Sequence, residues 1–228
     1  MAMTYPLRDN SPEGTYTVAI GSETSDSQKT QEFMIGTGNN SEPTNQEDIV
    51  AKETLKPGKA FTSSDGILKY KVLKSVAGNT LGTVQVTKVA KQKTKVSIPA
   101  QVTDPKTKQK FRVTSIGANA FKGNKKITKV SIGNEIETIG ASAFSGCKKL
   151  NSVTIGKKVK KIESKAFYNC KKLKKITIKS TKLKKVGKKA IKGIFKKAVI
   201  KAPKKQVKAY NKLFSKKTGR TSSMKIKK

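Results

Sequence analysis

Residues 113–181 read VTSIGANAFKGNKKITKVSIGNE, IETIGASAFSGCKKLNSVTIGKK and VKKIESKAFYNCKKLKKITIKST in three consecutive segments of 23 residues. The segments align without a gap, and seven positions keep apolar or small side chains in all three. A fixed period of this length indicates a stack of similar units, because repeats of ~20–50 residues are typical of solenoids and related arrays. The seven columns are Val113/Ile136/Val159, Ile116/Ile139/Ile162, Ala120/Ala143/Ala166, Phe121/Phe144/Phe167, Ile127/Leu150/Leu173, Val130/Val153/Ile176 and Ile132/Ile155/Ile178.

One such segment is too short to bury its own apolar side chains, so each turn needs its neighbours to exclude water. Runs such as residues 125–132 are short and rich in β-branched residues, which favours strands over helices. We therefore expect stacked parallel strands, with Val130 and Ile132 facing inward and with Lys129 and Ser131 facing outward. Two residues after each Ala-Phe pair stands Gly or Asn, which tolerate positive φ and predict a tight turn that ends a short helical turn. This column contains Gly123, Gly146, Asn169 and Gly193.

The repeat pattern fades on both sides of these segments. Upstream, residues 96–98 match residues 130–132 once an extra loop of 11 residues is allowed, which predicts a hairpin excursion around Asp104-Pro105. Downstream, residues 182–202 form a degraded repeat, and residues 203–228 are expected to cap the open end, since terminal repeats must cover a core edge. The cap is predicted to begin as a helix at Pro203, with Val207, Tyr210, Leu213 and Phe214 on one face and Gly219 beyond its end.

Two stretches, Val113-Thr-Ser-Ile-Gly-Ala-Asn-Ala-Phe121 and Ala143-Phe-Ser-Gly-Cys-Lys-Lys-Leu150, resemble the BspA-like leucine-rich repeats of bacterial surface proteins. The resemblance covers about residues 60–228, although Ile162-Glu163 and Asn124 depart from the commonest pattern. It implies a leucine-rich-repeat solenoid, a β-dominated α/β repeat in which parallel strands stack with short helical turns and a C-terminal capping helix follows. It also implies export, display at the cell surface, and adhesion or binding as one module of a longer chain.

Charge divides the chain near residue 54. Residues 1–53 contain 9 acidic and 3 basic residues, whereas the other 175 residues contain 5 acidic and 48 basic ones. We expect residues 1–36 to form a β-hairpin, the remnant of a preceding extracellular β-sandwich domain, because residues 15–20 alternate polar and apolar side chains. Residues 37–56 are rich in Gly, Asn, Ser, Thr, Pro and Glu, which predicts an acidic flexible linker. The solenoid is then expected to occupy residues 57–228.

Composition argues against catalysis. The chain contains neither His nor Trp, so it lacks the commonest general base and metal ligand, and we expect no enzyme activity, cofactor or metal site. The carboxylates of Glu135, Glu137 and Glu163 are expected to be solvated counter-charges. Buried thiols fit the equivalent, parallel positions of Cys147 and Cys170 better than a disulfide does. No apolar run approaches the ~18 residues of a membrane span, and the first residues lack the pattern of a signal peptide. The chain is then either cytoplasmic or a fragment of a longer precursor, and the resemblance favours a fragment of an exported one.

Two sets of side chains are candidate contact surfaces. The outward strand positions offer a flat polar face with few aromatic residues, which favours proteins or polyanions over neutral glycans. Pairs of lysines also recur, and stacked unit charges ~4.8 Å apart repel by about 0.9 kcal/mol in water. These lysines either keep a repetitive surface soluble or contact a polyanion that relieves the repulsion. The strand face contains Lys129, Ser131, Ser152, Thr154, Lys175 and Thr177, and the lysine ladder contains Lys125, Lys126, Lys148, Lys149, Lys171 and Lys172.

The leading hypothesis is a non-catalytic adhesion or binding module of a secreted bacterial protein, displayed at the cell surface. Its expected partners are host or bacterial surface proteins, anionic cell-wall polymers or acidic glycans, and the chain is expected to be a monomer without a transmembrane segment. One alternative is a basic region that attaches an upstream enzyme domain to the cell wall. Another is non-specific nucleic-acid binding, which is disfavoured because aromatic platforms are scarce and only 3 of the 51 basic residues are arginine.

Overall fold

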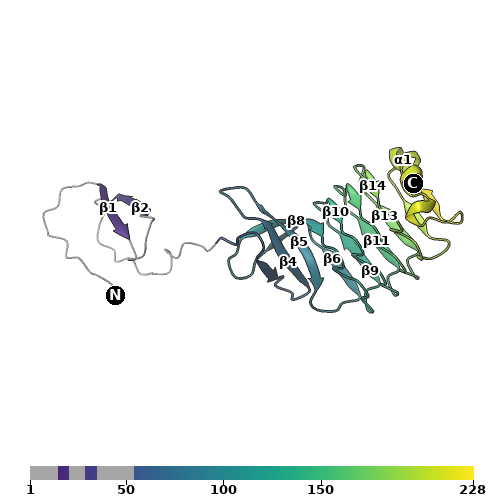
Figure 1. Cartoon of the computed structure of the whole chain (residues 1–228), viewed down its shortest axis with the longest axis horizontal. Helices are drawn as coiled ribbons and strands as arrows, with labels where there is room; N and C mark the ends of the chain where they lie inside the picture. The colour runs from purple at the N-terminus through teal and green to yellow at the C-terminus, as the bar shows by residue number, and fades with distance from the viewer. Residues whose placement is uncertain (1–14, 21–28, 35–53) are drawn as a thin grey trace. The chain divides into compact units, whose positions relative to one another are not determined.

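The structure is a computed structural model that describes residues 15–20, 29–34 and 54–228. The chain divides into two compact units, Met1–Val50 and Ala51–Lys228. In the first unit, β1 (Thr15–Ile20) pairs antiparallel with β2 (Lys29–Met34) (Figure 1). The rest of the predicted hairpin remnant, and the predicted linker up to residue 53, lie outside the described residues. The assignment of residues 1–36 and 37–56 therefore stays a prediction.

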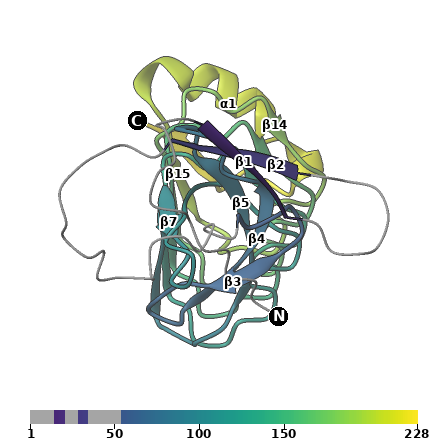
Figure 2. The same cartoon turned by 90° about the vertical axis from the view of Figure 1, so that its left-hand side faces the viewer.

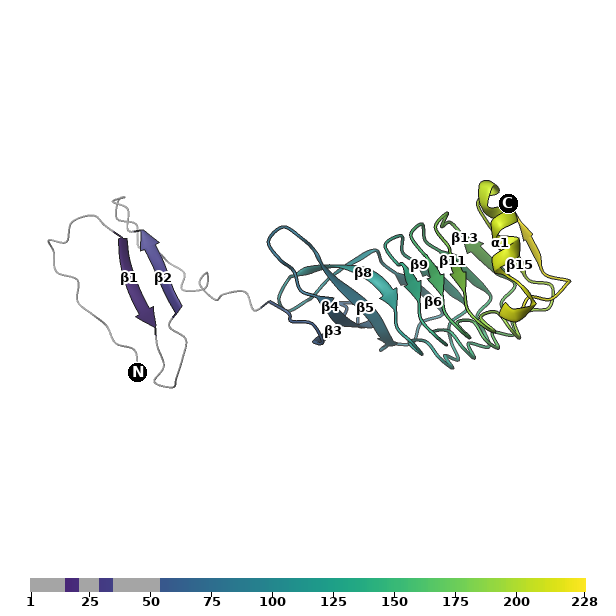
Figure 3. The same cartoon turned by 45° about the horizontal axis from the view of Figure 1, so that its top comes forward.

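Parallel strands in the second unit stack turn upon turn, as Figure 3 shows for β6, β9, β11 and β13. In the three clear repeats, paired residues of neighbouring turns are 23 apart in the sequence, as in the pairs of Val153 with Val130 and with Ile176. The stack confirms the predicted solenoid, and the strands form two sheets. One sheet contains β6 (Lys95–Ile98), β9 (Lys129–Ile132), β11 (Ser152–Ile155), β13 (Lys175–Ile178), β15 (Val199–Lys201) and β16 (Lys225–Lys227), and the repeats contribute β8 (Lys110–Ile116), β10 (Thr138–Ile139), β12 (Lys161–Ile162) and β14 (Lys185–Val186) to the other.

The core lies between the sheets and the turns. In β9, Val130 and Ile132 are buried while Lys129 and Ser131 are exposed, which confirms the predicted alternation. The phenylalanines of the three clear repeats stack inside: ring centroids of Phe121 and Phe144 are 4.7 Å apart, and those of Phe144 and Phe167 are 5.3 Å apart. Identical side chains thus contact each other from turn to turn.

The turn that carries each Ala-Phe pair alternates two kinds of backbone hydrogen bond. The N–H groups of Ala120, Lys122 and Asn124 donate to carbonyl oxygens three residues earlier, in the 3₁₀ manner. The N–H groups of Asn119, Phe121 and Gly123 donate instead to carbonyl oxygens of the next turn. Asn119 (59°) and Gly123 (69°) have positive φ, which prevents the turn from continuing as a helix. The predicted positive-φ column is confirmed, because Gly146, Asn169 and Gly193 have φ of 73°, 55° and 77°.

An antiparallel extension covers the N-terminal end of the stack. Figure 2 shows the stack viewed along its length. It contains β3 (Ala60–Thr62), β4 (Leu68–Lys74) and β5 (Gly82–Val89), and β5 then pairs parallel with β8. The ring of Phe61 lies 5.4 Å from that of Tyr70 and 5.6 Å from that of Phe111, so aromatic side chains close this end of the core. The predicted hairpin excursion is also confirmed, because β7 (Gln101–Thr103) pairs antiparallel with β8.

A short helix and a final strand cover the C-terminal end (Figure 1). Pro203 precedes η1 (Lys204–Gln206), α1 (Val207–Leu213) and η2 (Lys216–Thr218), which confirms the predicted capping helix. The hydroxyl of Tyr210 on α1 donates to the carbonyl oxygen of Ser180 (2.6 Å) and ties the helix to the stack. The chain then returns as β16, whose exposed lysines protect a sheet edge from pairing with other chains. Within the described part of the chain, no helix has the length and apolar character needed to cross a membrane.

Candidate functional site

The six residues of the strand face lie together on the outer side of one sheet. Ser152 on β11 pairs with Lys129 on β9 and with Lys175 on β13, and the three residues form one column. The second column contains Ser131, Thr154 and Thr177. β6 extends both columns, since Lys95 pairs with Lys129 and Ser97 pairs with Ser131.

The outer surface of this sheet is hollowed where β6 and β9 meet. The hollow has a volume of 470 Å³, and its lining includes Lys95, Lys129, Ser97 and Ser131. Lysine side chains are long and serine side chains are short, so the serines form a low strip between cationic groups. This part of the strand face can therefore offer hydroxyl donors and ammonium charges to one bound segment.

The lysine ladder lies in the turns that lead into β9, β11 and β13, and all six of its side chains are exposed. In the first of these turns, the side-chain oxygen of Asn124 accepts hydrogen bonds from the N–H groups of Lys126 and Ile127, both at 2.9 Å. In the next turn the N–H of Leu150 donates to the carbonyl oxygen of Cys147 at 3.0 Å. The ladder is thus held on hydrogen-bonded turns, apart from the strand positions of the strand face.

Both cysteines are buried free thiols. The Sγ of Cys147 donates to the carbonyl oxygen of Phe121, and that of Cys170 donates to the carbonyl oxygen of Phe144, each at 3.0 Å. The adjacent Cys147 sulfur, together with burial, raises the pKa of Cys170 above its usual range. Because both thiols are buried and donate to backbone carbonyl oxygens, these cysteines have a structural role.

Glu135, Glu137 and Glu163 each form an ion pair with a lysine of the next turn. The Nζ of Lys158 lies 2.8 Å from the carboxylate of Glu135. The corresponding distances are 2.9 Å for Lys160 with Glu137 and 3.8 Å for Lys185 with Glu163. The side chains of these pairs remain partly exposed, and such pairs contribute at most about 1 kcal/mol each. Among the described residues, no group of three His, Cys, Asp or Glu side chains could hold a metal ion.

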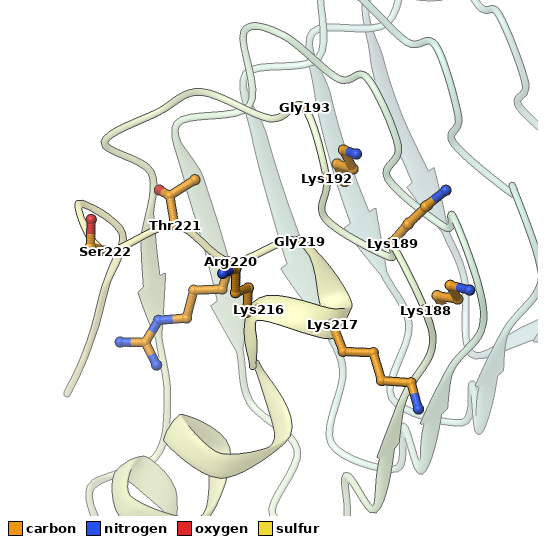
Figure 4. Close-up of a pocket in the computed structure, with 10 residues that line it drawn as sticks. All are labelled: Lys188, Lys189, Lys192, Gly193, Lys216, Lys217, Gly219, Arg220, Thr221 and Ser222. Atoms are coloured by element: carbon orange, nitrogen blue, oxygen red, sulfur yellow. The ribbon is translucent and has the colours of Figure 1, made fainter.

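Sequence reasoning missed a hollow at the C-terminal end, which we call the basic hollow (Figure 4). It has a volume of 870 Å³ and lies between the turn at residues 187–193 and the segment 216–222. One signal could have drawn attention to it: residues 164–228 contain 25 basic residues and no acidic one. Its lining consists of Lys188, Lys189, Lys192, Gly193, Lys216, Lys217, Gly219, Arg220, Thr221 and Ser222.

The stacked parallel turns and their covered ends define a repeat solenoid with polar outer faces. The chain belongs to the BspA-type leucine-rich repeat family, since the model of the BspA type leucine rich repeat region matches residues 108–228 in 6 copies. Among curated proteins, none matches the sequence.

Two solved bacterial structures share the fold. A leucine-rich repeat protein from Bacteroides ovatus ATCC 8483 is 29% identical, with a TM-score of 0.51 over 71% of this chain. The pneumococcal vaccine antigen PcpA is 25% identical, with a TM-score of 0.51 over 64% of this chain. The match spans 39% of the first protein and 41% of the second, so this chain is similar to a part of each.

Proposed function

We propose that this chain is a non-catalytic binding module that acts at a bacterial cell surface. Its strand face would contact partners that carry negative charge, either acidic protein surfaces or anionic polymers. The observation that carries this proposal is the in-register outer surface from β6 to β13, where Lys95, Lys129 and Lys175 flank a column of hydroxyl side chains. Membership of the BspA-type repeat family and similarity to a pneumococcal vaccine antigen support a surface role.

Charge supports this class of partner. In residues 54–228, basic residues exceed acidic ones by 43, and the acidic residues of the repeats are already paired with lysines. A field of one sign raises the local concentration of oppositely charged partners and accelerates their association. The strands present short polar side chains at regular spacing, which suits a broad contact rather than a deep pocket. We also propose that residues 57–228 form this module and that residues 1–36 belong to a preceding domain.

The chemistry of the described residues favours binding over catalysis. The thiols are buried and hydrogen-bonded to backbone carbonyls. The carboxylates of Glu135, Glu137 and Glu163 lie on successive turns and each is paired with a lysine, so no two of them are arranged as a free acid and base. A binding role uses the side chains that the solenoid leaves exposed.

The proposal can be tested by measuring binding of the full chain to intact bacterial cell walls, to walls stripped of phosphate polymers, and to an array of surface proteins, each across a salt series. The double variant Lys129→Ala/Lys175→Ala should bind about 10-fold or more weakly to the true partner. The control variant Lys91→Ala/Lys106→Ala has the same net charge and changes exposed lysines that are not part of the strand face. Equal losses in the two variants would show that the strand face is not the contact surface.

A further inference from the structure

We propose that the basic hollow is a second binding site, which takes a linear phosphate polymer at the C-terminal end of the solenoid. Six of the residues that line it are cationic: Lys188, Lys189, Lys192, Lys216, Lys217 and Arg220. The site uses none of the residues of the strand face or of the lysine ladder. It therefore does not depend on the strand-face proposal.

Backbone contacts hold the two walls of the basic hollow together. The N–H of Lys189 donates to the carbonyl oxygen of Lys217, and the N–H of Ile191 donates to that of Thr218, both at 3.0 Å. Gly219 has a φ of 98°, and a Cβ at this position would collide with the backbone of Lys192. The cap thus approaches the last turn as closely as glycine permits, so the walls are positioned before any ligand binds.

The lysines of the basic hollow lack carboxylate partners. Among the described residues, the ion pairs involve only Glu135, Glu137 and Glu163, and their lysines do not line the hollow. Arg220 has a different task, because its guanidinium donates to the side-chain oxygen of Asn211 (2.8 Å) and to the carbonyl oxygen of Phe214. In Figure 4 its head group points away from Lys188, Lys189 and Lys192. Arg220 braces the cap, and the lysines remain available for an anion.

The kinds of side chain present indicate the class of ligand. Lysine ammonium groups bind phosphates as point charges and lack the planar fork with which arginine reads a particular group. The volume of 870 Å³ extends over two chain segments, so it can hold several anionic groups in succession. Among the described residues that line the basic hollow there is no aromatic ring on which a base could stack. A repetitive phosphate chain without bases fits these features better than a nucleic acid does.

The experiment measures binding of polyphosphate to the full chain by calorimetry across a salt series. The hollow variant Lys188→Ala/Lys192→Ala/Lys217→Ala removes three exposed cations. Each phosphate contact adds about 0.7 to the slope of log K against log salt, so the variant should bind about 100-fold more weakly at ~0.1 M salt, with a slope smaller by about 2. The control Lys56→Ala/Lys91→Ala/Lys106→Ala has the same net charge and should stay within about 3-fold of the original chain, since only the diffuse field changes.

Several results would overturn the proposal. One is an equal loss in the hollow and control variants, which would mean that charge acts diffusely. Another is an unchanged salt slope in the hollow variant, which would mean that its three lysines contact no phosphate. Tighter binding of a sulfated glycan or of single-stranded DNA than of polyphosphate would refute the assigned ligand class. Circular dichroism and melting of each variant verify that its fold is retained.

Discussion

Replacement of Phe144 by alanine should destabilise the solenoid more than the same change at either phenylalanine beside it in the stack. The side chain of Phe144 is fully buried. Its ring stacks on Phe121 with an interplanar angle of 18° and on Phe167 with an angle of 5°. Truncation at the middle of the stack therefore removes two ring contacts and leaves a cavity between neighbouring turns.

The expected magnitudes follow from these contacts. Truncation of a buried phenylalanine costs about 3–5 kcal/mol, and an aromatic pair contributes about 0.5–1.5 kcal/mol beyond the area it buries. We expect a loss of about 5 kcal/mol for Phe144→Ala and about 4 kcal/mol for Phe121→Ala, which loses one of these ring contacts. The exposed Phe195, 37% accessible, provides the control. Its ring lies 5.4 Å from the Nζ of Lys174, and Phe195→Ala should cost only about 1 kcal/mol.

The assay is urea unfolding of the full chain followed by far-ultraviolet circular dichroism, with linear extrapolation to water. If Phe144→Ala unfolds before urea is added, Phe144→Leu provides the measurable variant, with an expected loss of about 1–2 kcal/mol. The reasoning is refuted if Phe144→Ala costs no more than Phe195→Ala. A larger loss at Phe121 than at Phe144 would also contradict it, because the two-sided stack would then not govern the energy.

Three further outcomes are expected. Gly156→Ala should lower the free energy of unfolding by about 3 kcal/mol, because the added Cβ would collide with the carbonyl of Gly133 on the preceding turn. Gly123→Asn should cost less than about 1 kcal/mol in the same urea-unfolding assay, since nothing lies near a Cβ at that position. Glu137→Gln should lower the melting temperature only slightly, because its ion pair is partly exposed, and the difference should shrink further at high salt. A thiol reagent monitored by absorbance should react with Cys147 and Cys170 only after unfolding, because both thiols are buried and hydrogen-bonded to backbone carbonyls.

The strand face could be predicted because side-chain direction alternates along a strand. Once Val130 and Ile132 are assigned to the core, Lys129 and Ser131 must face outward. The basic hollow could not be predicted in the same way. Lys188 and Lys217 are brought to one hollow by the cap, and no repeated spacing relates them. The partners of the glutamates were missed although the sequence offered a signal, because Glu135 and Lys158 are one repeat period of 23 residues apart.

The sequence by itself determined the turn length, the residues that face the core and the column of positive φ that begins at Gly123. These are properties of period and residue type, and stacking repeats them without change. Only the tertiary structure decided how strands close the ends of the stack, since the sequence predicted the capping helix but not the strands beside it. At one end β3, β4 and β5 form an antiparallel extension, and at the other β16 joins its sheet in parallel. Each end of the core occurs once in the molecule, so the contacts that cover it are unique and do not follow from the repeat period.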